Sequence, residues 1–235
     1  MTELPAAGRP DNIVFHDGTI RRVSISFSDQ LCEMELHLGD WISGQPKAES
    51  VFSCTKADSF FGRFDYVELA SQADPGNIQD GRLSETGDRL MLYLVGGLVE
   101  VAGGEIGLHA RPHECGRQKQ SRTVKTRASG LKELDNATLD CSVLDSIDFC
   151  PEKNACHLAL FVPKGECFSE RVPVRLSFGG VVSCIAKFDL ARMSEDTRWG
   201  NVRNCVVDVK RRTVRFYLPN GFLEVVARSA FIDRS

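Results

Sequence analysis

The sequence lacks any apolar run long enough to cross a membrane as a helix. Such a span needs about 20 consecutive apolar residues, and no segment of this 235-residue chain approaches that length. Its first residues, MTELPAAGRPDN, also lack the basic stretch and apolar core of a secretion signal. These absences predict a cytoplasmic protein that stays out of membranes. Its nine cysteines are then expected to be reduced thiols, and an odd number cannot all pair within one chain.

A global excess of basic charge is missing as well. The formal net charge is −3 and the sequence pI is about 6.0, which argues against nucleic acid as the partner. No glycine-rich phosphate loop and no G-x-S-x-G turn occurs. Zinc sites usually use two cysteine pairs with two to four residues between partners, a spacing that neither the 113–115 segment nor Cys150, Cys156 and His157 provides. We therefore expect no metal site and no cofactor.

The sequence does contain an internal repeat. Residues 12–102 align with residues 136–226 at a constant offset of 124 positions, without a gap. The matches lie mostly at turns and at apolar positions, as expected for a repeated scaffold. They include Phe64/Phe188, Asp65/Asp189, Gly76/Gly200, Asn77/Asn201, Tyr93/Tyr217, Leu94/Leu218, Gly97/Gly221, Glu100/Glu224 and Val101/Val225.

Each repeat has the pattern of short β-strands. The segment 32–38, CEMELHL, alternates apolar and charged residues, which is typical of a half-buried strand. Turns at 95–97 and 219–221 predict hairpins, in which Gly97 and Gly221 are expected to supply a positive φ that a side chain would not tolerate. Segments 60–73 and 184–197 could each hold a strand end followed by a short helical turn.

These patterns predict an all-β, mainly antiparallel fold with little helix. We expect two similar sandwich-like or open-barrel-like domains related by an internal duplication. Residues 1–11 are expected to form a tail, 12–110 the first domain, 111–135 a basic linker or loop and 136–235 the second domain.

The polar residues shared by both repeats are expected to be structural. An aspartate after a strand can cap nearby amides, Gly-Asn is typical of turns, and a glutamate within Leu-Glu-Val suits the solvent face of a strand. These positions are Asp65, Asp189, Asn77, Asn201, Glu100 and Glu224. A hydrolase that uses the duplicated carboxylates remains an alternative. His16 and Asp17 precede a glycine in a tight-turn pattern, and their aligned positions are Asp140 and Cys141, so this pair is not common to both repeats.

Several short motifs resemble small all-β bacterial proteins of the polymorphic-toxin immunity type. His16, Asp17 and Ile20 match the HD-x-x-I start of that pattern in the first repeat. The second repeat matches its V-x-L-x-F-x-G-V strand at Val174, Leu176, Phe178, Gly180 and Val181. Neither repeat carries every element. The resemblance implies a protein that binds a cognate toxin and blocks its active site, without chemistry of its own.

The leading hypothesis is a non-enzymatic protein that binds a protein partner, with toxin neutralisation as its specific form. Trp41, Tyr66 and Trp199 are candidate contact residues, because Trp and Tyr contribute much interface energy. A small-molecule or carbohydrate binder is the second hypothesis, and the hydrolase is the third. The sequence leaves the oligomeric state open.

Overall fold

The computed structural model describes residues 15–38, 48–71, 76–110, 130–131, 134, 139–164, 167–195 and 201–234. The first half contains β1 (Thr19–Ser26), β2 (Leu31–Leu38), β3 (Ala48–Asp65), α1 (Tyr66–Ser71), β4 (Ile78–Leu83), β5 (Arg89–Leu94) and β6 (Gly97–Ala110). The second contains β7 (Val143–Cys150), η2 (Pro151–Lys153), β8 (Ala155–Lys164), β9 (Cys167–Asp189), α3 (Leu190–Glu195), β10 (Asn204–Asp208), β11 (Thr213–Leu218) and β12 (Gly221–Arg234).

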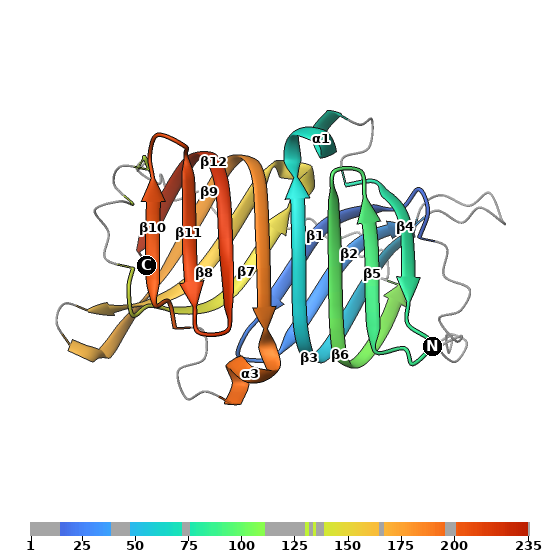
Figure 1. Ribbon diagram of the computed structural model, residues 1–235, viewed down its shortest axis with the longest axis horizontal. Helices are drawn as coiled ribbons and strands as arrows, with labels where there is room; N and C mark the ends of the chain where they lie inside the picture. Colours follow the sequence, from blue (N-terminus) through green and yellow to red (C-terminus); the bar gives the residue numbers. More distant parts are fainter. Residues whose placement is uncertain are drawn as a thin grey trace.

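The strands form one 12-stranded sheet that folds into two layers (Figure 1). In the view of Figure 1, the front layer runs β10-β11-β12-β9-β3-β6-β5-β4, and β8, β7, β1 and β2 cross behind it. All pairings are antiparallel, which confirms the expected fold class at the level of all-β. The long strands β3 and β9 belong to both layers.

Each long strand changes partner near its middle. β3 pairs with β2 as far as Cys54 and with β9 from Ser59 onward. β9 pairs with β8 as far as Gly179 and with β3 from Ser183 onward. Between the two partners, Lys56 has φ 53° and Gly180 has φ 60°, a left-handed conformation that interrupts a regular strand. The two irregular residues are 124 positions apart.

The two halves meet at two seams inside the sheet. At the rear seam, β1 pairs with β7 and Ser24 lies opposite Asp148. At the front seam, β3 pairs with β9 and Gly62 lies opposite Ala186. In each seam the central residue therefore faces the residue 124 positions later, which gives the sheet a local two-fold symmetry. Strand pairing therefore runs without a break from one half to the other. Whether residues 12–110 and 136–235 fold as separate domains stays a prediction.

The layers enclose one apolar core to which both halves contribute aromatic rings. The Phe64 and Phe149 ring centroids are 5.3 Å apart, those of Phe27 and Phe188 are 5.0 Å apart, and Phe60 stacks on Phe149 at 6.0 Å. All five rings are at most 5% exposed. Burying one such side chain stabilises the folded state by about 1.5–3 kcal/mol. The aromatic contacts between the halves therefore contribute substantially to the stability of the whole sheet.

The two shared turn positions of the repeat, Gly97 and Gly221, are required for a different reason from the expected one. Neither has a positive φ, so that prediction was wrong; it is Gly96 that has φ 80°. A Cβ on Gly97 would lie 2.5 Å from the carbonyl oxygen of Arg63, and one on Gly221 would lie 2.6 Å from that of Lys187. The hairpin backbones approach the neighbouring strand too closely for any side chain.

Candidate functional site

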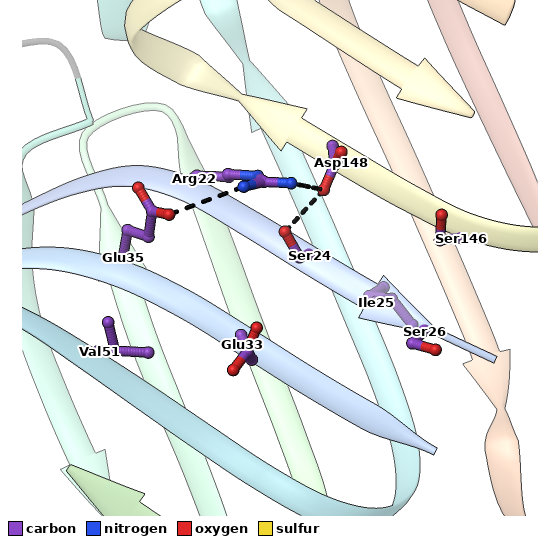
Figure 2. Close-up of a pocket in the computed structure, with 9 residues that line it drawn as sticks. All are labelled: Arg22, Ser24, Ile25, Ser26, Glu33, Glu35, Val51, Ser146 and Asp148. Carbon is purple, nitrogen blue, oxygen red and sulfur yellow. Dashed lines mark hydrogen bonds and ion pairs between the residues drawn. The ribbon is translucent and has the colours of Figure 1, made fainter. Parts of the chain in front are cut away.

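A polar hollow of about 280 Å³ lies on the outer face of the rear layer, over the rear seam. Figure 2 shows Arg22 among the lining residues, between Glu35 on β2 and Asp148 on β7. The side chains alternate along β1, so Val23 and Ile25 enter the core while Arg22, Ser24 and Ser26 face outward.

The polar groups at the centre of the hollow satisfy one another. The Asp148 Oδ1 atom accepts hydrogen bonds from Arg22 Nη2 at 2.7 Å and from Ser24 Oγ at 2.6 Å, and Arg22 Nη1 lies 3.7 Å from Glu35. Partial burial lowers the pKa of Arg22, but the hydrogen bond and charge of Asp148 outweigh it and raise that pKa above its ordinary value. The cluster therefore joins β1 to β7 and leaves Arg22 committed to internal partners.

A row of polar side chains crosses the rear layer from one long strand to the other. Successive cross-strand pairs join Ser53, Glu33, Ser24, Asp148, His157 and Ser177. His157 Nδ1 lies 3.0 Å from Ser177 Oγ, and burial together with the charge of Arg175 lowers the pKa of His157.

Asp148, His157 and Ser177 are the residue types of a nucleophilic triad, in which the acid must hold the base in position. Here Asp148 instead accepts its hydrogen bonds from Arg22 and Ser24. Among these described residues, no hydrogen bond joins Asp148 to His157, so this row does not form a catalytic relay. Sequence reasoning missed the row because its members come together only through strand pairing.

The outer face of the front layer has a different composition. Its outward positions carry apolar side chains from both halves: Phe61, Met91, Tyr93, Leu98, Ile185, Val206, Tyr217 and Phe222. Tyr217 is 42% exposed and Val206 is 39% exposed, so this face is not covered by another layer at those positions. The apolar run at 90–95 and the largely apolar segment 221–227, which Glu224 interrupts, were the sequence signal for this face, since a strand with one wet face alternates.

Two cations lie at the centre of this apolar face. Arg63 on β3 lies between Leu98 and Ile185 in the cross-strand pairing, and Lys187 on β9 lies between Phe61 and Phe222. Both cations are exposed. Arg63 and Lys187 are 124 positions apart, as are Leu98 and Phe222, so the arrangement follows the local two-fold symmetry of the front seam.

The repeated glutamates lie on the same face and are already paired. Glu100 Oε1 lies 3.5 Å from Arg89 Nη1, and Glu224 forms a close ion pair with Arg215. Three strand spacings of about 4.8 Å separate β6 from β12, so the two carboxylates are about 14 Å apart or more.

The repeated aspartates act as helix caps. Asp65 Oδ1 accepts the backbone N–H groups of Val67 at 3.0 Å and Glu68 at 3.1 Å, and Asp189 Oδ1 accepts that of Arg192 at 3.0 Å. Ser59 pairs with Asp189 and Asp65 with Ser183 in the front seam. The two aspartates are therefore six strand residues apart, or about 20 Å, beyond the roughly 5–10 Å that a pair of hydrolytic carboxylates requires.

The remaining candidate residues are distributed over the fold. Asn77 and Asn201 form equivalent bridges to Thr19 and Val143, and Asn77 Oδ1 is buried without a partner among the described residues. His16 Nδ1 lies 3.0 Å from Asp17, whose φ of 60° forms the expected tight turn.

The structure corrects one candidate contact residue. Tyr66 is 1% exposed and its hydroxyl donates to the Ala155 carbonyl at 3.4 Å, so it is part of the core rather than of a contact surface. Trp41 and Trp199 lie outside the described residues, as does most of the basic segment 111–135. No group of three or more His, Cys, Asp or Glu side chains within the described ranges is arranged to hold a metal ion.

No protein-family model, curated protein or solved structure matches the chain. In the part of the chain that the structure describes, no helix has the length and hydropathy of a membrane span.

Proposed function

We propose that this chain is a non-enzymatic, cytoplasmic protein that binds a protein partner through the outer face of its front layer. The observation that supports this most directly is the apolar content of that face, which both halves share. Soluble proteins seldom expose contiguous apolar patches unless these are interaction sites. The outer face of the rear layer provides an internal comparison, because its central row consists of serine, glutamate, aspartate and histidine.

Toxin neutralisation is the specific form of this proposal. It rests on the motifs at 16–20 and 174–181 that resemble immunity-type proteins. A protein that acts by covering another needs a broad surface. Seven strand spacings of about 4.8 Å and strands of about 20 Å make the front face roughly 34 by 20 Å, close to the roughly 800 Å² that each partner buries in a typical stable complex.

We also propose that the two halves arose by duplication of one unit. The repeat in sequence supports this, and so does the strand pairing. The irregularity of β1 between Ile20 and Arg22 recurs in β7 between Leu144 and Ser146, 124 positions later. Duplication would explain how a single chain obtained a face wide enough for a partner.

The test is binding to the purified products of the genes beside this one, measured by calorimetry. A Val206→Ser/Tyr217→Ser variant of the front face is expected to bind about tenfold or more weakly, since exposed apolar anchors dominate interface energy. Glu33→Gln/Val51→Ser on the rear face is the matched control and should bind as the unaltered protein does.

Loss of binding in the rear-face variant alone would contradict the surface assignment. Absence of a protein partner, together with a sugar or nucleotide that raises the melting temperature, would favour the second hypothesis. In that case the ligand would occupy the hydroxyl-lined and carboxylate-lined hollow of Figure 2.

A further inference from the structure

The centre of the front face carries positive charge that no carboxylate in the described part of the chain neutralises. Arg63 and Lys187 have no carboxylate within ion-pair distance among the described residues. Glu100 lies on β6, the strand beside β3, and pairs with Arg89. Glu224 lies on β12, the strand beside β9, and pairs with Arg215. A carboxylate attracts a cation flanked by apolar side chains more strongly than one in open water, because a docked partner lowers the dielectric constant around the charge pair.

We infer that the front face binds an acidic protein surface, whose carboxylates meet Arg63 and Lys187 while its apolar side chains cover the four flanking residues. This inference rests on the proposed function and specifies the chemistry of the partner. The flanking residues are Phe61, Leu98, Ile185 and Phe222. We refer to these six residues as the central patch.

The positions of the charges argue against a second copy of this chain as the occupant. The local two-fold symmetry relates Arg63 to Lys187 around the Gly62–Ala186 pair. A second copy stacked on the same centre would therefore bring four cations together, while the nearby Glu100 and Glu224 stay paired with Arg89 and Arg215. Like charges that meet at an interface are costly, so the arrangement disfavours a symmetric dimer and favours an acidic partner.

Single-stranded nucleic acid is the other anionic class that binds open sheet faces, by stacking bases on aromatic rings above basic side chains. Glu100 and Glu224, each paired with its own arginine, lie next to the central patch and interrupt the row of cations that a continuous phosphate backbone needs. An acidic protein surface can avoid the two glutamates, because its carboxylates are discrete. The balance of charges thus favours protein over nucleic acid.

The experiment uses the full-length chain and can be carried out before a partner has been identified. A random 15-residue peptide library displayed on phage is selected against the unaltered protein, and the affinities of the enriched peptides are measured by fluorescence anisotropy. We expect enrichment of peptides that combine Asp or Glu with aromatic or aliphatic residues. Their affinity should fall about tenfold or more in Arg63→Glu/Lys187→Glu and also fall as salt is added.

Two further variants separate charge from structure. Arg63→Lys/Lys187→Arg keeps both charges and should retain binding. Lys153→Glu/Lys210→Glu makes the same change in net charge at exposed positions outside the central patch and should also retain it. Equal melting temperatures show that each variant is folded, as expected for exposed side chains.

Three outcomes would overturn the inference. These are absence of enriched peptides, enrichment of basic or uncharged peptides, and tighter binding of an oligothymidylate that the charge-reversed variant loses. If a neighbouring gene product binds through Val206 and Tyr217 but is indifferent to Arg63→Glu/Lys187→Glu, the inference fails and the proposed function stands. If acidic peptides bind the central patch and no protein partner exists, the proposed function fails instead.

Discussion

At the residue scale, several glycines are required because the backbone of a neighbouring strand leaves no room for a side chain. Gly97 and Gly221 each lie against the carbonyl group of a central-patch cation on the adjoining strand. The same contact in both halves explains why these glycines match in the repeat. It also connects the hairpin turns to the placement of Arg63 and Lys187, because a displaced turn would move β3 or β9.

Gly97→Ala is expected to lower the free energy of unfolding by about 1–3 kcal/mol, since a well-packed site must shift to admit the methyl group. Urea unfolding followed by circular dichroism measures the change. Gly130→Ala is the control, because its Cβ would have no neighbour within 4 Å. Equal unfolding midpoints for the two variants would contradict the steric role of Gly97.

Buried thiols should react only when the protein opens. Burial raises the pKa of Cys54 to about 11. Burial, with an added contribution from Cys54, raises the pKa of Cys32 as well. The thiolate is the reactive form, so a raised pKa leaves very little of it at neutral pH.

Alkylation with iodoacetamide at pH 8 should therefore label the exposed Cys141 within minutes, and label Cys32 and Cys54 only after denaturant is added. Mass spectrometry of peptides from a time course reads each site separately. Labelling of Cys32 at the rate of Cys141 under native conditions would show that the core around β2 and β3 opens readily.

At the scale of elements, the short helices depend on the residues that end the long strands. α1 and α3 are six residues each, too short to be stable by propensity alone. Asp65 and Asp189 satisfy amide groups of their first turns. The alternation of the strands was apparent from the sequence, whereas 60–73 and 184–197 were ambiguous and a strand end followed by a short helical turn was one possibility.

Asp65→Ala should cost about 1 kcal/mol of unfolding free energy, whereas Asp65→Asn, which keeps an acceptor at the cap, should cost much less. The same pair of substitutions at Asp189 should follow the same order, although Asp189→Asn also removes the charge that pairs with Arg192. The midpoints of urea denaturation provide the comparison. Asparagine variants as unstable as the alanine variants would indicate that the negative charge, and not the hydrogen bond, stabilises the helix.

At the scale of the whole molecule, the seams make the halves dependent on each other. Phe60 and Phe64 from the first half pack against Phe149 and Phe188 from the second. Separation of the halves would expose these rings and leave one side of β1, β3, β7 and β9 without its strand partner at the seams. Neither half can therefore keep its present packing alone.

Residues 1–135 and 136–235, produced separately, are each expected to be molten or to aggregate, and to regain cooperative unfolding only when mixed. Near-ultraviolet circular dichroism and dye binding distinguish these states. A monomeric half with a sharp thermal transition of its own would contradict the prediction, and would support the sequence-based boundaries at 110 and 136 as those of independent domains.

The sequence by itself determined the all-β class and the strand-rich character of the chain, while the register that relates residue 12 to residue 136 stays a prediction. Alternation and turn residues are local, and a two-residue period repeats wherever a strand has one buried face. Only the tertiary structure decided which strands meet at the seams, because pairing depends on residues far apart in the chain. That pairing buried Tyr66, distributed the duplicated carboxylates over separate positions and gathered Arg63 and Lys187 at the centre of one apolar face.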